Sequence, residues 1–352
     1  MRAARLERLR GELDRAVGTH LVTSPPNVRY LSGFESSNAA LLVGRDAARL
    51  VTDGRYIEAA RGLQDVEVVQ SSRDLSTFLG GRLHELADGP VGFEAAHVTY
   101  AGWQALSASE VELVPTTGLV EALRAVKDPG ELEAIRAAAA VANAVYERLA
   151  EEGGVVGLTE AQLARRLAVL LDDAGADGLA FPTIAASGPN AALPHHDPGD
   201  RRIEARETLI VDLGAALGGY VSDCTRTFAT GDLPDDLARA YVACREAQAE
   251  ALAAVRPGAS AREVDGIARR RLEAEGYETL HGLGHGLGIE VHEAPRLADT
   301  SDATLEAGNV VTVEPGVYLA GRGGIRIEDL VIVADEGPEV LTTFTKELVT
   351  LR

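Results

Sequence analysis

Four carboxylates and one histidine, each inside its own short motif, constrain the fold of this 352-residue chain more than any other feature. Together they form an oxygen-rich ligand set, which suits two divalent ions and hydrolysis by water held between them. One such motif alone is also typical of an ordinary turn or strand end. Five in one chain favour a metal site, which requires a fold that brings them together. The residues are Asp212, Asp223, His285, Glu314 and Glu328, in the motifs Ile210–Gly214, Val221–Thr227, Gly284–Gly288, Thr312–Gly316 and Ile325–Asp329.

The first two acidic residues lie in a predicted hairpin. Thr208–Leu213 is an apolar run with β-branched members, Gly214–Gly219 is a glycine-rich turn, and Tyr220–Phe228 is a second strand candidate. A hairpin places Asp212 and Asp223 on facing strands. Because close carboxylates repel and raise each other's pKa, this arrangement favours a cation between them.

The last two acidic residues are expected at strands further along the chain. Val310–Val313 leads directly into Glu314, and Gly324–Val333 has the composition of a strand. On a single strand, Arg326 and Glu328 share one face because they are two residues apart. We therefore expect a guanidinium beside the Glu328 carboxylate.

Histidines crowd into residues 281–295. His281 and His285 have the four-residue spacing of a helical zinc pair, but glycine at every second position from 282 to 288 makes a helix improbable. We predict instead a loop that feeds a strand and also carries His292. His196, in a separate segment, is expected to be ordinary loop surface.

With these motifs, the chain resembles the pita-bread metallopeptidases, and within them the branch of aminopeptidase P and prolidase. The resemblance covers nearly the whole chain, because Asn27–Phe34 and Val51–Tyr56 are similar to the family's creatinase-like amino-terminal domain. It implies an α/β (α+β) fold in two domains. Residues 1–125 would form the creatinase-like α/β domain, and residues 126–352 a pita-bread catalytic domain with a curved antiparallel sheet.

The resemblance also assigns the metal ligands. It implies two divalent ions per subunit, with Mn(II) as the expected ion and Co(II), Zn(II) or Fe(II) as alternatives. Asp212 and Asp223 would hold one ion, while the other would be held by Asp223, His285, Glu314 and Glu328. In this scheme Asp223 and Glu328 bridge the two ions.

Three residues are expected to take part in catalysis and two to bind substrate. By resemblance, Glu314 is the proton shuttle, while His195 and His292 orient the peptide and stabilise the tetrahedral intermediate as an oxyanion hole does. His281 matches a residue that lines the pocket for proline, although a loop histidine bonded to backbone is the alternative. Arg326 is expected to order the second bridging carboxylate or to bind a substrate carboxylate.

The function implied by the resemblance is that of a metal-dependent exopeptidase. It would hydrolyse the Xaa-Pro bond at the N-terminus of short proline-containing peptides, as an Xaa-Pro aminopeptidase or an Xaa-Pro dipeptidase. A methionine-type or general aminopeptidase of the same fold is one alternative, although methionine aminopeptidases typically lack a long amino-terminal domain. An inactive pita-bread module that binds partners is another, although such modules usually lose metal ligands.

Composition and charge limit the other classes of function. A hydrophobic content of 46% and a charged content of 25% are ordinary for a globular protein. A net charge of −20 argues against nucleic acid, which needs a basic patch, and against an anionic membrane surface. No run approaches the ~20 apolar residues of a membrane span, and the arginine-rich start lacks the apolar stretch of a secretory signal.

Cysteine content and the family resemblance lead to two further expectations. The two cysteines, Cys224 and Cys244, provide no disulfide framework, and Cys224 is interpreted as a reduced packing residue. We therefore expect a cytoplasmic protein. The resemblance implies a homodimer in which residues 1–125 help to close the pocket.

Local patterns place a domain boundary near residue 125. Before it, the strand candidates His20–Thr23, Ala39–Val43 and Ala48–Thr52 alternate with helical patterns such as Asp74–Leu86, which predicts an α/β unit. After it, three helix starts are predicted. Asp128 before Pro129 suits a cap and a first turn, and capping-box spacing occurs at two more places, Thr159 with Gln162 and Ser260 with Glu263.

Overall fold

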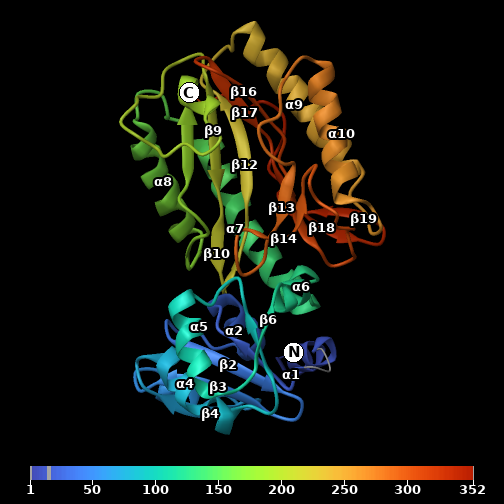
Figure 1. The fold of residues 1–352 in the computed structure, drawn as a ribbon. Helices are drawn as coiled ribbons and strands as arrows, with labels where there is room; N and C mark the ends of the chain where they lie inside the picture. The colour runs from blue at the N-terminus through green and yellow to red at the C-terminus, as the bar shows by residue number, and fades with distance from the viewer. Residues whose placement is uncertain (1, 14–16, 352) are drawn as a thin grey trace. The chain divides into compact units, whose positions relative to one another are not determined.

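The protein folds into two compact units, Met1–Arg124 and Ala125–Arg352, in the computed structural model (Figure 1). The structure describes residues 2–13 and 17–351. Each unit has its own sheets and its own buried core.

The first unit is built on a six-stranded mixed sheet. Its strands are β1 (Thr19–Val22), β2 (Ala39–Gly44), β3 (Ala48–Asp53), β4 (Glu67–Ser71), β5 (Val91–Glu94) and β6 (Leu113–Thr116). Its helices are α1 (Arg2–Glu12), α2 (Pro25–Ser32), α3 (Ile57–Ala60), α4 (Leu75–Leu86), α5 (Tyr100–Leu106), the 3-10 turn η1 (Ser107–Ser109) and α6 (Leu119–Ala125). The strand order is β4-β3-β2-β1-β5-β6, in which β2 is antiparallel to both neighbours and the other pairs are parallel. The three predicted strands and the predicted helix are confirmed, and Asp74 caps α4.

The second unit repeats one order of elements, two helices followed by a group of strands. Its helices are α7 (Pro129–Glu152), α8 (Glu160–Asp173), the 3-10 turn η2 (Gly188–Ala192), α9 (Asp235–Ala253) and α10 (Ala261–Ala274). The strands after α8 are β7 (Gly178–Leu179), β8 (Ile184–Ser187), β9 (Thr208–Leu213), β10 (Ala215–Leu217), β11 (Tyr220–Val221) and β12 (Cys224–Ala229). Those after α10 are β13 (Gly284–Gly286), β14 (Glu293–Leu297), β15 (Val310–Val313), β16 (Gly316–Leu319), β17 (Gly323–Arg326), β18 (Asp329–Ala334) and β19 (Gly337–Val340).

Antiparallel sheets form the centre of this unit. Their strand orders are β12-β9-β8, β11-β10-β7, β14-β13-β15-β18-β19 and β16-β17. Tyr146 of α7 and Leu167 of α8 pack on the sheet of β9 and β12. Cys244 of α9 and Leu272 of α10 belong to a second core with Val331 of β18, and Figure 1 shows α8 and the α9–α10 pair on opposite sides of the strands. The expected α/β (α+β) fold class is confirmed.

All three predicted helix starts are confirmed. Asp128 and Thr159 each form a capping box with the third residue of their helix, Glu131 and Gln162 respectively. Ser260 caps α10 by accepting the N–H of the residue three positions later. Each cap satisfies N–H groups that the first turn of a helix leaves without partners.

The hairpin predicted around Asp212 and Asp223 is also confirmed, although its turn is shorter than expected. β9 pairs with β12 in an antiparallel ladder. The turn does not span residues 214–219, because β10 pairs with β11 within that range. The chain instead reverses at Gly218 and Gly219, whose positive φ angles favour glycine.

The second strand of this hairpin is interrupted, and Asp223 lies in the interruption. Ser222 and Asp223 belong to neither β11 nor β12. The facing chain comes very close here, because a Cβ on Gly214 would lie 2.0 Å from the carbonyl oxygen of Ser222. The Asp223 side chain therefore need not alternate with those of β12.

The prediction of one strand over Gly324–Val333 is wrong. β17 ends at Arg326 and β18 begins at Asp329, and these strands belong to different sheets. Glu328 lies in the break, where its N–H donates to the carbonyl oxygen of Thr225 at 3.1 Å. The alternation of a single strand therefore does not relate Arg326 to Glu328.

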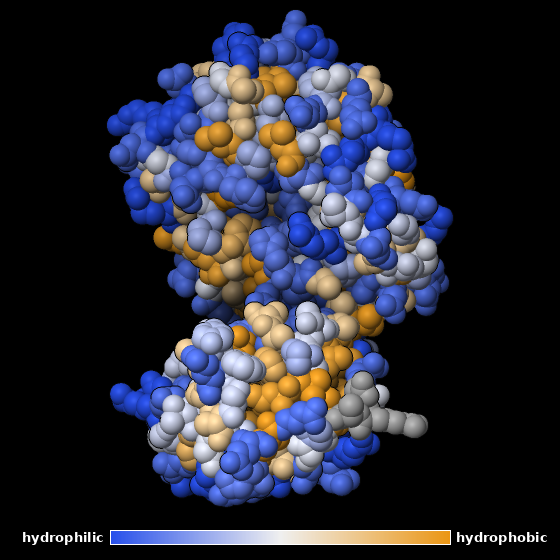
Figure 2. Space-filling model, viewed as in Figure 1, coloured by the Kyte–Doolittle hydropathy of each residue, from blue (hydrophilic) through white to orange (hydrophobic). Residues whose placement is uncertain are grey.

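Polar side chains cover most of the face of the second unit that Figure 2 shows. Within the described residues, none of the helices has both the length and the apolar character needed to cross a membrane. Cys224 and Cys244 are buried free thiols, so Cys224 is the packing residue expected from the sequence.

Candidate metal centre

The five predicted ligands meet in the second unit. Ligand atoms of Asp223, His285 and Glu328 all lie within 4.8 Å of one another. Glu314 joins them, because its Oε1 is 3.3 Å from Nε2 of His285, an atom 3.7 Å from Oδ2 of Asp223. Asp212 is connected to Glu328 through two side chains, because Arg326 donates both to Asp212 and to Oγ1 of Thr225, which in turn donates to Glu328.

Two buried oxygen atoms of this cluster lack a hydrogen-bond donor. Among the described residues, Oδ1 of Asp212 and Oε1 of Glu328 have no partner. Asp212 is 8% exposed and Glu328 is 1% exposed, so bulk water has little access to supply the missing hydrogen bonds. A buried charge without a partner is costly unless a cation faces it. The residues present therefore fit divalent ions, and a set of four carboxylates and one imidazole suits Mn(II), Co(II) or Fe(II).

His285 is oriented by its neighbours in the manner of a metal ligand. Its Nδ1 lies 3.0 Å from the carbonyl oxygen of Gly286, which can only accept, so Nδ1 carries the proton and Nε2 is left to bind. Its backbone N–H donates to Oγ1 of Thr312. The predicted loop at this place is correct for residues 287–292, but His285 itself lies in the short strand β13.

In the absence of a bound cation, burial and mutual repulsion shift the pKa values of these carboxylates. Burial, followed by the charges of neighbouring carboxylates, raises the pKa of Asp223 and of Glu328 well above the usual range. Burial also raises the pKa of Asp212, against the opposing charge of Arg326. Burial alone would raise the pKa of Glu314 as well, but its hydrogen bond to His285 and the charge of that ring outweigh burial and lower it.

Metal removal should destabilise the protein more at higher pH. In the metal-free fold the pKa values of Asp223 and Glu328 are raised, so unfolding releases protons and stability falls as pH rises above the ordinary carboxylate pKa. Bound divalent cations favour the ionised ligands and remove this loss. The melting-temperature difference between Mn(II)-loaded and chelator-treated protein should therefore be larger at about pH 8 than at about pH 5.5. Thermal denaturation at both pH values measures it, and an equal difference would contradict the assignment.

Two threonines that the sequence interpretation missed hold two of the candidate ligands. Oγ1 of Thr225 donates to Oε2 of Glu328 at 2.8 Å, and Oγ1 of Thr312 donates to Oε1 of Glu314 at 3.2 Å. Thr312 precedes Glu314 by two residues and Thr225 follows Asp223 by two. A search for hydroxyls two positions from each acidic residue would have found both.

Arg326 contacts a different carboxylate from the one expected. Its Nη2 donates to Oδ2 of Asp212 at 2.6 Å, and its link to Glu328 runs through Thr225, whose Oγ1 accepts from Nε at 3.1 Å. Nη1 donates to the hydroxyl of Tyr318 at 3.0 Å and to a backbone carbonyl. The Arg326 side chain is 4% exposed, so protein groups surround its guanidinium.

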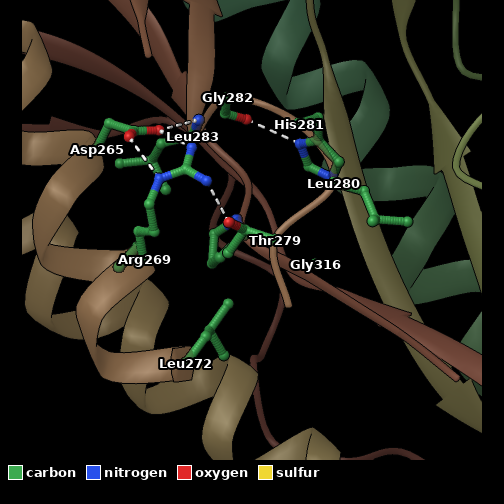
Figure 3. Close-up of a pocket in the computed structure, with 11 residues that line it drawn as sticks. Asp265, Arg269, Leu272, Thr279, Leu280, His281, Gly282, Leu283 and Gly316 are labelled. Atoms are coloured by element: carbon green, nitrogen blue, oxygen red, sulfur yellow. Dashed lines mark hydrogen bonds and ion pairs between the residues drawn. The ribbon is translucent and has the colours of Figure 1, made fainter. Parts of the chain in front are cut away.

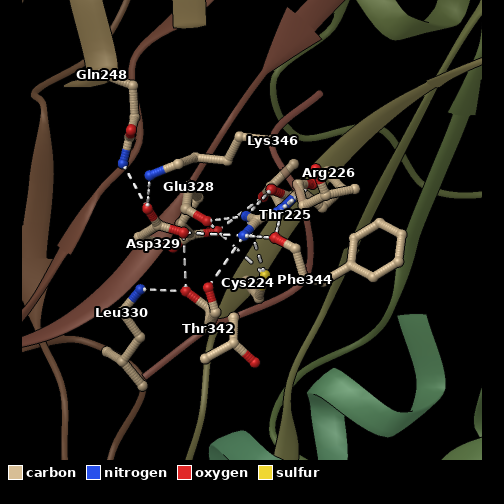
Figure 4. Close-up of polar contacts among 12 residues, drawn as sticks. Cys224, Thr225, Arg226, Gln248, Glu328, Asp329, Leu330, Thr342, Phe344 and Lys346 are labelled. Carbon is tan, nitrogen blue, oxygen red and sulfur yellow. Dashed lines mark hydrogen bonds and ion pairs between the residues drawn. The ribbon is translucent and has the colours of Figure 1, made fainter. Parts of the chain in front are cut away.

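A second buried guanidinium supports the break that carries Glu328 (Figure 4). Arg226 donates to the backbone oxygen of Glu328 and, through Nη2, to Oδ1 of Asp329 at 2.9 Å. Oδ2 of Asp329 accepts from Gln248 at 2.9 Å and from Lys346. Oγ1 of Thr342 also donates to Oδ1 of Asp329, at 3.0 Å. Because the Asp329 side chain is fully buried, its four donors fix the first residue of β18 and with it the preceding candidate ligand.

Side chains of α10 hold the loop that contains His281 (Figure 3). Oδ1 of Asp265 accepts the N–H of Leu283 at 2.9 Å, and Arg269 bonds both Asp265 and Thr279. His281 borders a cavity of about 10 Å³ in this region. A space of that size admits about one water molecule, so this cavity is not the proline pocket.

The ring of His281 has polar partners on both sides. Its Nδ1 faces the carbonyl oxygen of Gly282 at 2.8 Å, as in the backbone-bonded alternative, and its Nε2 lies 2.9 Å from the hydroxyl of Tyr318. Since Nδ1 donates to the carbonyl, Nε2 accepts from Tyr318. Tyr318, which the sequence interpretation missed, thus links His281 to Arg326.

His292 lies beside the candidate ligand His285. Its ring centroid is 4.4 Å from that of His285 at an interplanar angle of 72°. Burial, and then the charges of His285 and His195, lower the pKa of His292, against an opposing effect of Glu314. His195 is therefore also near this ring, and both histidines are exposed to solvent.

The expectation for His196 is wrong. Its side chain is only 14% exposed, and its Nε2 lies 2.8 Å from Oε2 of the fully buried Glu160. Glu160 also accepts from Ser187 and Asn190, so it holds the segment that leads to His195. Sequence alone gave no signal for a contact between residues this far apart.

Models of known families match both units. The model described as metallopeptidase family M24 matches residues 133–335. The model described as the creatinase/prolidase N-terminal domain matches residues 5–126.

Known proteins are similar to this chain along its whole length. An Xaa-Pro dipeptidase of Pyrococcus furiosus is 32% identical, over 98% of this chain and 99% of that protein. The solved structure of an Xaa-Pro dipeptidase from Bacillus anthracis is 36% identical, with a TM-score of 0.95 over 100% of both chains. The structure of an X-Pro aminopeptidase from Thermotoga maritima MSB8 is 31% identical, with a TM-score of 0.88 over 98% of this chain and 99% of that one.

Proposed function

This chain belongs to metallopeptidase family M24, and on that premise we propose that it hydrolyses the Xaa-Pro bond at the N-terminus of short peptides. The observation that carries the proposal is the cluster of Asp223, His285 and Glu328, which Glu314 and Asp212 join, with two buried carboxylate oxygens that lack donors. The dipeptidase and aminopeptidase names of the similar proteins support the choice of bond. An inactive binding module has no need of this costly cluster.

The proposed ligand assignment follows the family resemblance, and the cluster supports it. Asp212 and Asp223 would hold one divalent ion and Asp223, His285, Glu314 and Glu328 the other, with Asp223 and Glu328 shared by both and Mn(II) as the expected metal. The chemistry that such a pair supplies is a water molecule of lowered pKa and the neutralisation of buried negative charge. Arg326 is assigned to positioning, since it fixes one oxygen of Asp212 and leaves the other without a protein donor.

The remaining groups would act on the peptide. Glu314, whose pKa is lowered by His285, is ionised at neutral pH and can accept a proton from the attacking water and pass it to the leaving nitrogen. His292, whose pKa is lowered, is neutral and can donate one N–H to the carbonyl oxygen as negative charge develops there. We assign His195 to orienting the same part of the peptide. His281 stays the proposed wall for the proline ring, held in place by Tyr318.

A panel of four peptides tests this function. With Mn(II) or Co(II), the protein should cleave an Xaa-Pro dipeptide or an Xaa-Pro-Yaa tripeptide, and the ratio of their kcat/KM values separates dipeptidase from aminopeptidase. The matched Xaa-Ala peptide should be cleaved poorly. Proline has no amide hydrogen, so an enzyme that selects it must recognise its ring, and alanine lacks that ring. Efficient cleavage of Met-Ala-Xaa would instead favour a methionine-type enzyme. Metal binding without cleavage of any peptide would favour the binding module.

The homodimer and the cytoplasmic location expected from the sequence stay predictions. The same holds for the role of residues 1–125 in closing the pocket.

A further inference from the structure

A buried ion pair includes Glu293, the residue that follows His292 in the chain. Nζ of Lys127 is 3.2 Å from Oε2 of Glu293, and the two side chains are 1% and 5% exposed. Lys127 belongs to the short segment before α7, so the pair joins residues that are 166 positions apart. A buried pair of this kind persists only where both charges are well satisfied.

The Glu293 carboxylate closes the turn that leads to His292. Its Oε1 accepts the N–H groups of Ile289 at 2.8 Å and Glu290 at 3.0 Å. A Cβ on Gly288 would lie 2.8 Å from Oε2, so the carboxylate packs directly on the backbone of the turn. Residues 287–292 have no regular secondary structure of their own, and this carboxylate therefore supplies a fixed point for them.

Lys127 is itself held by backbone contacts. Its N–H donates to the carbonyl oxygen of Gly308 at 2.9 Å, and Asn309 donates to the carbonyl of Ala125 at 2.9 Å. The following residue, Asp128, caps α7. The ammonium group is thus presented to Glu293 from an anchored segment rather than from a mobile side chain on the surface.

We propose that Lys127, through Glu293, is a positioning residue that holds His292 against the substrate carbonyl. Without the ammonium, the buried carboxylate would turn towards other donors or water, and the turn at 288–292 would lose its fixed point. The ring of His292 would then leave its place beside His285, and a displacement of about 1 Å can cost about 10²-fold in rate. The inference rests on the proposed role of His292.

A double-mutant cycle tests this coupling. Lys127→Met should lower kcat on an Xaa-Pro dipeptide by up to about 10²-fold, with KM and metal content little changed. Lys127→Arg, which restores a cation, should recover part of the loss. In a His292→Ala background, Lys127→Met should cost little more, because the group that it positions is gone. If the fold-losses of kcat in the two single variants multiply in the double variant, the inference is overturned.

The controls separate this inference from the proposed function. Arg136→Met removes a cation from the exposed pair with Glu339, whose side chains are both 43% exposed, and should leave kcat unchanged. If Lys127→Met does not fold, the same double-mutant cycle is measured with Glu293→Gln, which keeps the side-chain volume and one acceptor oxygen. A normal kcat in Lys127→Met overturns only the inference. A normal kcat in His292→Ala overturns both the inference and the assigned role of His292.

Discussion

Asp223→Asn should abolish metal binding and lower turnover by ~10³-fold or more, the loss expected when several kcal/mol of charge stabilisation disappears. Asp223 is 5% exposed, and its ligand atom lies within 4.8 Å of those of His285 and Glu328. A neutral amide offers one weaker oxygen donor, and its nitrogen cannot bridge two cations. Metal analysis of the purified variant and kcat on an Xaa-Pro peptide measure the two losses.

The fold should survive this substitution. In the metal-free protein, the charges of Glu328, Asp212 and Glu314 act against ionisation of Asp223, so an uncharged residue relieves repulsion. The metal-free variant should therefore melt no lower than the metal-free parent protein, and added Mn(II) should raise the melting temperature of the parent protein alone. Asp302→Asn, at a side chain that is 93% exposed, is the matched control and should change nothing. An active Asp223→Asn enzyme with full metal content would disprove the ligand assignment.

Much of the fold and the ligand set could be predicted because the signals are local. The cap at Asp128 and the hairpin of β9 and β12 depend on residues close in sequence, and both are present. The ligand candidates were found in the same way, since each acidic residue lies within its own short motif. Local patterns of this kind specify the elements, and the elements bring the carboxylates together.

The errors occurred where a contact from a distant segment decides the structure. A continuous β-strand pattern concealed the break at Glu328, which exists because the chain passes from the sheet of β17 to that of β18. The break is held by Arg226, which also donates to carbonyl oxygens of Thr342 and Phe344 near the end of the chain. His196 was misjudged for the same reason, because its partner Glu160 precedes it by 36 positions. Periodicity carries no information on such pairings.

His292→Ala should lower kcat by ~10²–10³-fold while metal content stays normal, as expected for the loss of one donor to a developing oxyanion. The ring lies beside His285 but outside the group of residues whose ligand atoms cluster, so its removal should leave metal binding intact. Because its pKa is lowered, first by burial and then by the charge of His285, the ring is neutral at neutral pH and donates through one nitrogen. Steady-state kinetics on an Xaa-Pro dipeptide and metal analysis of the same sample measure both quantities.

Two further variants decide what the His292 ring contributes. His292→Gln keeps an N–H donor of similar reach and should recover part of the lost kcat, which a purely packing role would not predict. His84→Ala, on an exposed side chain of α4, should have no effect on kcat or metal content. If His292→Ala loses metal in proportion to activity, the residue is a ligand rather than a donor to substrate. If the loss falls on KM alone, the contact is made equally in the ground state and the transition state, and His292 binds the peptide without accelerating its hydrolysis.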